Sequence, residues 1–276
     1  MIIVDTHAHI YHPDETLYPM RENPHRTPPG IGYIDHLKAN IQMAGVERVV
    51  LVQTGSAYRW DNRLVAGMAS ANRTKMVGVC NLDAASPESP AIFETLSAQN
   101  VKGLRLEPTQ YGRSSYYHEG AVRLFEKIRE MDAVICAHIN EVFLEDLARL
   151  ANEFPDVPIV LDHSAYLNAS DLPESSRLNS VCDLAQHKNI YAKLTFGVTG
   201  SEQAYPFTDT HEVIRRVISA YTPERCMWGS DFPCEHWLKK ASYQEHLQMF
   251  TEELGLSADE KTAILSETPL KLWFSS

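Results

Sequence analysis

Two histidines near the start of the chain directly follow an apolar run and are separated by one residue. Residues 2–9 read IIVDTHAH, which places the histidines at positions His7 and His9. In an extended strand the side chains alternate between two faces, so both imidazoles would point the same way, about 7 Å apart along the chain. Two imidazoles that arrive from one side suit a shared metal ion. The pair alone is weak support for a metal site, because further ligands must come from elsewhere.

Further ionisable side chains stand near the ends of other apolar runs. If those runs are parallel strands of a closed barrel, their carboxyl ends surround one mouth, however far apart they lie in the sequence. Histidine and carboxylate ligands suit zinc, manganese or iron. The set predicted at this mouth comprises His7, His9, Arg105, Glu107, His138, His163 and Asp231.

Short apolar runs rich in β-branched residues recur along the whole chain. They are continuously apolar rather than alternating, as expected of strands that are buried on both faces. Eight strands are predicted, near 2–10, 47–55, 76–83, 101–108, 133–140, 158–165, 190–196 and 226–233.

Helical patterns lie between these strands. Apolar residues at three- and four-residue spacing predict helices over 34–44, 144–154 and 213–220, and Gly45 stands where a C-terminal cap belongs. Eight consecutive strand–helix units favour a (β/α)₈ barrel that forms one domain over residues 1–276. An open doubly wound sheet is the alternative, but the Gly-rich first turn typical of that fold is absent.

Composition and net charge limit the classes of molecule that this protein is expected to bind. The 276 residues carry a formal charge of −11 with no basic run, which disfavours binding to nucleic acid or to an anionic membrane. No segment is apolar over the roughly 18 residues that a bilayer crossing needs, and no signal region is recognised, so a cytoplasmic location is expected. The partner expected is a small molecule, and a homo-oligomer stays open.

Three irregular segments follow predicted strand ends. Residues 11–32 and 109–118 are rich in tyrosine, the former also in proline, and residues 197–208 contain glycine and tyrosine. Loops at the carboxyl ends of barrel strands commonly carry the chemistry, so these segments are predicted to cover a substrate. Simple packing over the helices is the alternative for each loop.

Several short motifs, taken together, resemble the amidohydrolase superfamily. They are VDTHAH at 4–9, AH at 137–138, LDH at 161–163 and GSDFP at 229–233. The run ERVVLVQTG at 47–55 adds a resemblance to the branch that includes sugar-acid lactonases and 2-pyrone-4,6-dicarboxylate hydrolase.

This resemblance implies a metal centre. His163 matches a histidine that either binds a second metal ion or forms a hydrogen bond to the nucleophilic water. The branch also includes members that are metal-independent. The implied ligands of one divalent ion, with zinc favoured and manganese or iron as alternatives, are His7, His9, His138 and Asp231.

The number of metal ions depends on the fourth predicted strand. The binuclear pattern of the superfamily that this chain resembles has a lysine at the mouth end of this strand, but Lys102 lies at the start of the strand, which favours one ion. Glu107 could instead bridge two ions together with His138 and His163. The alternative is that Glu107 forms an ion pair with Arg105 on the same strand face.

The activity implied is hydrolysis of a lactone or a similar ester of a small carboxylate or sugar acid. Asp231 would take a proton from water and return it to the leaving oxygen, and His163 would orient the water or stabilise the oxyanion. A substrate carboxylate would be bound by Arg105, with help from Arg113, Tyr58 and Arg59.

Two other functions stay open from the sequence. The residues around the predicted metal ion could equally serve decarboxylation or hydration of an unsaturated dicarboxylic acid. A barrel that binds a ligand without catalysis is the alternative from a different class. A serine nucleophile is disfavoured, because no G-x-S-x-G motif occurs.

Overall fold

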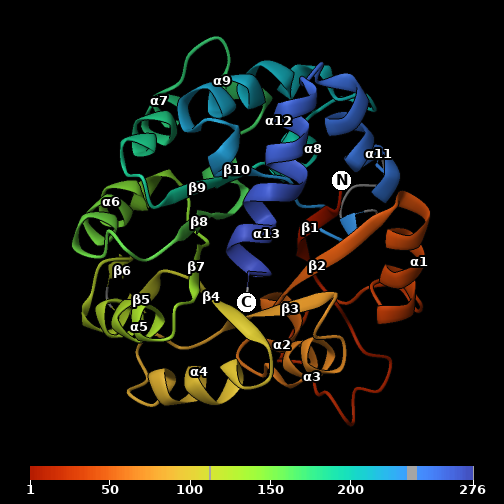
Figure 1. Ribbon diagram of the computed structural model, residues 1–276. Coiled ribbons are helices and arrows are strands. Elements are labelled where there is room, and N and C mark those ends of the chain that lie inside the picture. The colour runs from red at the N-terminus through yellow and green to blue at the C-terminus, as the bar shows by residue number, and fades with distance from the viewer. Residues whose placement is uncertain (112, 235–240, 276) are drawn as a thin grey trace.

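Eight parallel strands lie side by side in the order in which they occur along the chain (Figure 1). The computed structural model describes residues 1–111, 113–234 and 241–275. The strands are β1 (Ile3–Ala8), β2 (Val46–Val52), β3 (Met76–Asn81), β4 (Val101–Leu106), β7 (Val134–Ala137), β8 (Ile159–Leu161), β9 (Ile190–Lys193) and β10 (Cys226–Met227).

The first and last strands meet and close the sheet. The backbone N–H groups of Thr6 and His9 donate to the carbonyl oxygens of Trp228 and Phe232, at 3.2 and 2.8 Å. Closure of eight parallel strands removes both free edges and confirms the predicted (β/α)₈ barrel.

Helices surround the barrel and cover the outer face of the strands (Figure 1). The predicted helices over 34–44, 144–154 and 213–220 are confirmed as α1, α6 and α9, and Gly45 ends α1 in the left-handed conformation with φ 71°. The larger helices are α1 (Ile34–Ala44), α3 (Arg63–Ala71), α4 (Ser89–Ser97), α5 (Glu119–Glu130), α6 (Leu144–Glu153), α7 (Ser176–Asp183) and α9 (His211–Tyr221), followed by the shorter α11 (Tyr243–Gln248), α12 (Ala258–Thr262) and α13 (Thr268–Trp273). Within the described residues, no helix has the length and the apolar surface that crossing a membrane requires.

The inside of the barrel has an apolar floor. Inward residues such as Val50 and Val79 form a buried cluster with Trp273, which α13 inserts from below. At Gly103 in β4, an added Cβ would lie 2.8 Å from the Trp273 ring, so only glycine leaves room for the indole. Because this end is filled with apolar side chains, polar chemistry is confined to the other end.

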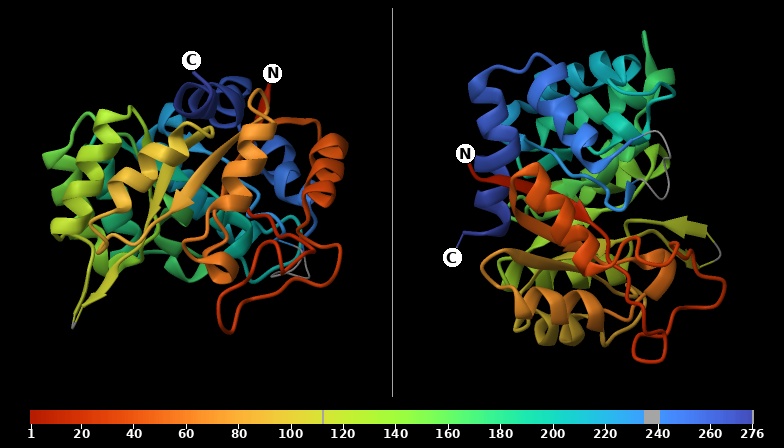
Figure 2. Two further views of the ribbon diagram at one scale, coloured as in Figure 1. Left: turned by 90° about the horizontal axis from the view of Figure 1, so that it is seen from below. Right: turned by 90° about the vertical axis from the view of Figure 1, so that its right-hand side faces the viewer.

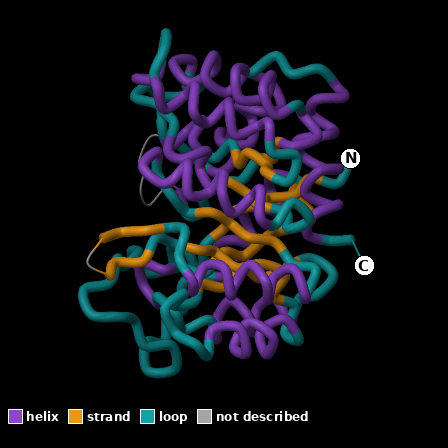
Figure 3. The backbone as a smooth tube through the Cα atoms, turned by 90° about the vertical axis from the view of Figure 1, so that its left-hand side faces the viewer, coloured by secondary structure: helices purple, strands orange, loops and turns teal. Residues whose placement is uncertain are grey.

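The two ends of the barrel differ in their connections. Figure 2 shows both termini at one end, with the loop over 11–32 and the hairpin β5 (Thr109–Tyr111)–β6 (Arg113–Ser115) at the opposite end. Figure 3 shows the same hairpin extending away from the strands of the barrel. Part of the segment 109–118, predicted to be irregular, therefore forms a short antiparallel hairpin.

Most predicted strands are shorter in the structure, and the strands β8 and β10 are shortened most. β8 ends at Leu161 instead of 165, and β10 ends at Met227 instead of 233. After β8, four consecutive non-glycine residues from His163 to Tyr166 have φ values between 45° and 62°. Such left-handed conformations cost about 1–2 kcal/mol per residue, so local sequence preference does not favour this turn. Both departures lie at the mouth, where His163 and Asp231 are presented.

Candidate active site

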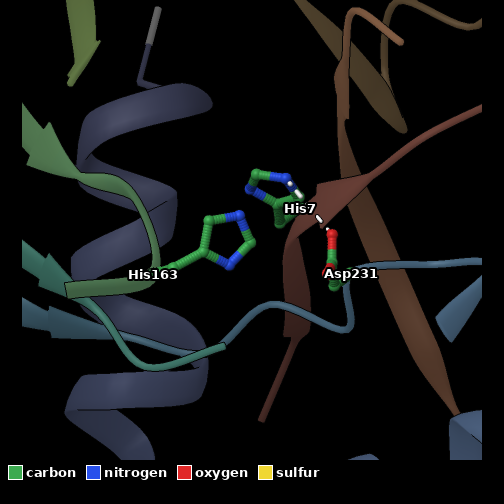
Figure 4. Close-up of side chains that lie close together, drawn as sticks. All are labelled: His7, His163 and Asp231. Atoms are coloured by element: carbon green, nitrogen blue, oxygen red, sulfur yellow. Dashed lines mark ion pairs between the residues drawn. The ribbon is translucent and has the colours of Figure 1, made fainter. Parts of the chain in front are cut away.

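His7, His9 and Asp231 converge on one point at the mouth of the barrel. The Nε2 atoms of His7 and His9 are 3.1 Å apart. Oδ1 of Asp231 lies 3.6 Å from Nε2 of His7 and 3.5 Å from Nε2 of His9. Figure 4 shows the Asp231 carboxylate pointing toward His7, and the ring of His163 lies beside the ring of His7. The sequence pair is thus joined by a carboxylate from more than two hundred residues away.

An irregularity in β1 aims the two histidines. Asp5 pairs with Val49 and Ala8 with Leu51, so β1 has one residue more than β2 over this stretch. The Asp5 carboxylate accepts hydrogen bonds from the Ser230 backbone N–H at 2.9 Å and the Tyr243 hydroxyl at 2.9 Å. These contacts fix β1 against the segment that carries Asp231.

His163 completes the cluster from the left-handed turn after β8. Its ring centroid lies 4.8 Å from that of His7, and its Nδ1 is 2.7 Å from the Thr195 hydroxyl oxygen. Burial lowers the pKa of His163 to about 4, even though Asp231 opposes the shift. His163 is therefore a neutral imidazole at neutral pH.

Asp231 carries a negative charge in this setting. Burial alone would raise its pKa, but His163 and His9 outweigh burial and lower the pKa below its usual range. Its backbone has φ 54°, a strained conformation for a non-glycine residue. A charged carboxylate beside the neutral imidazole of His163 can accept a proton.

His138 lies in the same cavity, but other residues hold its ring. Its Nδ1 is 3.0 Å from Oε1 of Glu107, and its Nε2 contacts the Tyr166 hydroxyl. Since a carboxylate only accepts, Nδ1 carries the proton and Tyr166 donates to Nε2. The nitrogen that would bind a metal ion is thus engaged by Tyr166, and His138 does not join the compact group of His7, His163 and Asp231.

Arg105 and Glu107 do not pair with each other in the structure. Nε of Arg105 donates to Oδ2 of Asp162 at 2.9 Å, and the Arg105 side chain is almost fully buried. Burial would raise the pKa of Glu107, but its contact with His138 outweighs this and lowers the pKa to about 2. Glu107 therefore orients His138, and Asp162 is the hydrogen-bond and ion-pair partner of Arg105.

Lys193 and Asp162 are site residues that the sequence analysis missed. Lys193 Nζ lies 2.7 Å from Oδ1 of Asp162 and 3.1 Å from Nδ1 of His7, and both charged side chains have no exposed surface. A lysine inside a strand that is buried on both faces requires an anionic partner, and this signal was present in the run over 190–196. The lysine links His7 to the buried pair of Asp162 and Arg105.

His9, His163 and Asp231 line a cavity of about 660 Å³, and His7 is buried beside them. Its walls come from the loops after β2, β8 and β9, with Tyr166 and Glu202 among them. Of the other residues predicted to bind substrate, Tyr58 is buried and its hydroxyl accepts from the backbone N–H of His12 at 2.9 Å. Arg59 lines a neighbouring cavity. The side chain of Arg113 lies outside the described part of the structure.

Nε2 of His7, Nε2 of His9 and Oδ1 of Asp231 are the donor atoms that a divalent metal ion could share. Two imidazole nitrogens and a carboxylate oxygen that lie 3.1–3.6 Å apart match the ligand types of zinc and leave space for a common ion. His9 has the required tautomer, because its Nδ1 is 2.9 Å from the Val52 carbonyl oxygen, which only accepts. His7 differs, because the Lys193 ammonium only donates and therefore favours the proton on Nε2. The donor set fits an ion, and Lys193 weakens that fit.

Comparisons with known proteins identify the family. The chain matches the Amidohydrolase family model over residues 4–274. It is 26% identical over 235 residues to 4-sulfomuconolactone hydrolase of Rhizobium radiobacter, covering 83% of this chain and 75% of that protein.

Two solved structures share the whole fold. One is a protein of Acinetobacter baumannii described as "probable 2-pyrone-4,6-dicarboxylic acid hydrolase" with citric acid bound, at 16% identity and a TM-score of 0.85, covering 100% of both chains. The other is an amidohydrolase of Burkholderia multivorans with bound zinc, at 19% identity and a TM-score of 0.81, also covering 100% of both chains. The chain belongs to the amidohydrolase family, and it is a hydrolase.

Proposed function

We propose that this enzyme opens the lactone ring of a small acidic substrate by hydrolysis. The observation that carries the proposal is the convergence of the ionised Asp231 with the imidazoles of His7, His9 and His163, because Asp231, His9 and His163 line one cavity and His7 is buried beside them. The relatives support the reaction class, since the Rhizobium protein is named as a lactone hydrolase. A carboxylate that can accept a proton and neutral imidazoles that can orient water are what ester hydrolysis needs.

We further propose that a divalent metal ion, zinc in preference to manganese or iron, assists the reaction. His7, His9 and Asp231 would hold the ion, which would polarise the substrate carbonyl and make its bound water more acidic. Lys193 beside His7 predicts that the ion is held weakly. His138 and Glu107, which a second ion would require, are occupied by each other and by Tyr166, so one ion is proposed.

The protein's own residues would move the proton. Asp231 takes a proton from the attacking water. It returns the proton to the ring oxygen as the bond between the carbonyl carbon and the ring oxygen breaks. His163 is neutral and is held at Nδ1 by Thr195, so it can orient the water or donate to the developing oxyanion. Arg105 would fix Asp162, and Asp162 would fix the ring of His7 through Lys193.

The test combines substrate screening with metal analysis of the purified protein. The wild type should hydrolyse at least one carboxylated lactone, and a chelator should reduce the rate until zinc is restored. The Asp231→Asn variant should lose about 10³-fold or more in kcat, since it removes the proposed proton acceptor. Full activity of that variant would refute the scheme, and release of CO₂ from an unsaturated acid would establish the decarboxylase alternative instead.

A further inference from the structure

A separate cavity of about 290 Å³ lies at the end of the barrel opposite the candidate active site. This amino-end cavity is surrounded by the first residues of β2, β3 and β4 and by the segment that follows α13, where both termini lie (Figure 2). Three of its lining residues are cations from different segments: Arg48 in β2, Arg73 in the turn before β3 and Lys102 in β4. The order of the strands in the barrel thus brings three positive charges to one cavity.

The walls of the amino-end cavity supply no counter-ion for these cations. Within the described residues, no aspartate or glutamate lines it, although acidic residues outnumber basic ones by 36 to 25 in the whole chain. In the same part of the chain, none of the three cations has a carboxylate oxygen within 4.0 Å. Arg123 on α5, by contrast, pairs with Glu119 at 2.7 Å. Like charges that gather without a counter-ion repel one another, so a bound anion would stabilise this end of the barrel.

Both guanidinium groups are held in place by contacts that leave donors unused. Nη2 of Arg73 donates to the carbonyl oxygen of Ala98 at 2.7 Å. The guanidinium carbon of Arg48 lies 5.5 Å from the centre of the Phe274 ring, which is within the range of a cation–π contact. Each guanidinium carries five N–H groups, more than these contacts use. The two arginines are therefore positioned in advance and retain N–H groups for a ligand.

A buried indole in the same wall has a donor without a partner. Trp273, which completes the apolar floor of the barrel, also lines the amino-end cavity and is 1% exposed. Among the described residues, its Nε1 has no hydrogen-bond acceptor. An indole N–H only donates, and a buried donor without an acceptor destabilises the fold. Guanidinium and ammonium groups also only donate, so the ligand that suits this wall is one that only accepts.

We propose that the amino-end cavity binds a phosphate group, as inorganic phosphate or as a small phosphate monoester, through Arg48, Arg73 and Lys102. A phosphate group carries a charge of about −1.5 to −2 at neutral pH, and its acceptor oxygens face several sides, as three converging cations require. A carboxylate offers only two oxygens at one end. The ligand is not a substrate, because the apolar cluster around Trp273 lies between this cavity and the catalytic residues. Its binding would connect the end of α13 to the first residues of β2 and β4, and this role does not depend on the proposed reaction.

Titration calorimetry with inorganic phosphate tests this site, with chloride keeping the ionic strength constant. The wild type should bind phosphate saturably, and Arg48→Ala should bind it at least about tenfold more weakly, as expected for loss of a charge-assisted contact. Lys102→Ala, at an exposed position where the fold tolerates the change, should also weaken binding. The matched control Arg123→Ala removes the same charge from an arginine that is already paired, and its affinity should stay within about twofold of the wild-type value. A parallel titration with glycerol phosphate distinguishes the sources: tighter binding than phosphate indicates an ester, and weaker or equal binding indicates the free ion.

Thermal unfolding gives a second, independent measurement. Phosphate at about 100 times its Kd should raise the Tm of the wild type by about 5 °C, because the ligand binds only the folded chain. The same concentration should raise the Tm of Arg48→Ala by less than about half as much, and that of Arg123→Ala by as much as the wild type. No saturable phosphate binding by the wild type, equal affinities for Arg48→Ala and Arg123→Ala, or a Tm increase that chloride reproduces at the same ionic strength would overturn the assignment.

Discussion

Replacement of Asp162 by asparagine should strongly destabilise the fold. Asp162 is fully buried and is the partner of two buried cations, with Lys193 at 2.7 Å and Arg105 at 2.9 Å. An amide at this position keeps the shape of the side chain but removes its charge, which leaves two cations without a counter-ion. Removal of one partner from a buried ion pair typically costs 3–5 kcal/mol, so we expect a loss of about 4 kcal/mol in the free energy of unfolding.

A surface pair supplies the matched control. Asp61 binds Arg63 at 2.6 Å, a shorter distance than either contact of Asp162, but the Arg63 side chain is 58% exposed. Asp61→Asn should cost less than about 1 kcal/mol, because water screens the pair. Chemical denaturation of both variants with guanidinium chloride measures the difference, and equal losses would refute the argument that burial determines the cost.

The same variant has a distinct pH dependence. Burial alone would raise the pKa of Asp162, but Lys193 and Arg105 outweigh burial and hold the pKa well below the usual 3.8. A carboxyl whose pKa is lowered by folding stabilises the protein above its unfolded pKa, and this stabilisation is lost as the pH falls. The difference in stability between the wild type and Asp162→Asn should therefore shrink as the pH falls below about 4. A difference that grows instead would contradict the assignment of charge.

Three further predictions follow from the site and its supports. Gly229→Ala should lower the free energy of unfolding by about 1–3 kcal/mol and reduce activity, because the new Cβ would lie 2.7 Å from Cβ of His7. Gly67→Ala inside α3 should instead stabilise the protein by about 0.5–1 kcal/mol, because the new Cβ meets no atom within 4 Å. Thermal unfolding measures both effects. Lys193→Met should raise zinc affinity at least about tenfold in a chelator competition, since it removes the cation beside Nδ1 of His7. Because burial lowers the pKa of His163 to about 4, its ring should stay neutral until the pH falls toward 4, and an NMR titration of His163 centred near 6.5 would exclude it as the neutral group.

The fold could be predicted because each strand has a recognisable local sequence pattern. A continuous apolar run such as that of β3 (Met76–Asn81) is sufficient to indicate a strand buried on both faces, and eight such runs determine the barrel. The ends of the strands were less predictable. The turn from His163 to Tyr166 contains no glycine, and its left-handed conformation is imposed by packing at the mouth rather than by local preference.

The candidate site was predictable in its residue types but not in its pairings. The convergence of His7, His9 and Asp231 follows from their positions near the carboxyl ends of β1 and β10, which are neighbours in the closed barrel. The pairing of Arg105 with Asp162, and the occupation of His138 by Tyr166, join residues that are 57 and 28 positions apart. A single sequence contains no signal for such a choice of partner, because several partners are compatible with each strand.

Insertion of Trp273 from α13 into the floor of the barrel has a consequence for shortened forms of the chain. A variant that stops before Thr268 would retain all eight strands but would admit water to the valines that pack around Trp273. The cooperativity of the whole barrel thus depends on one indole from its far end, and hydrogen exchange in β2 and β3 should report its removal before any change is visible at the catalytic mouth.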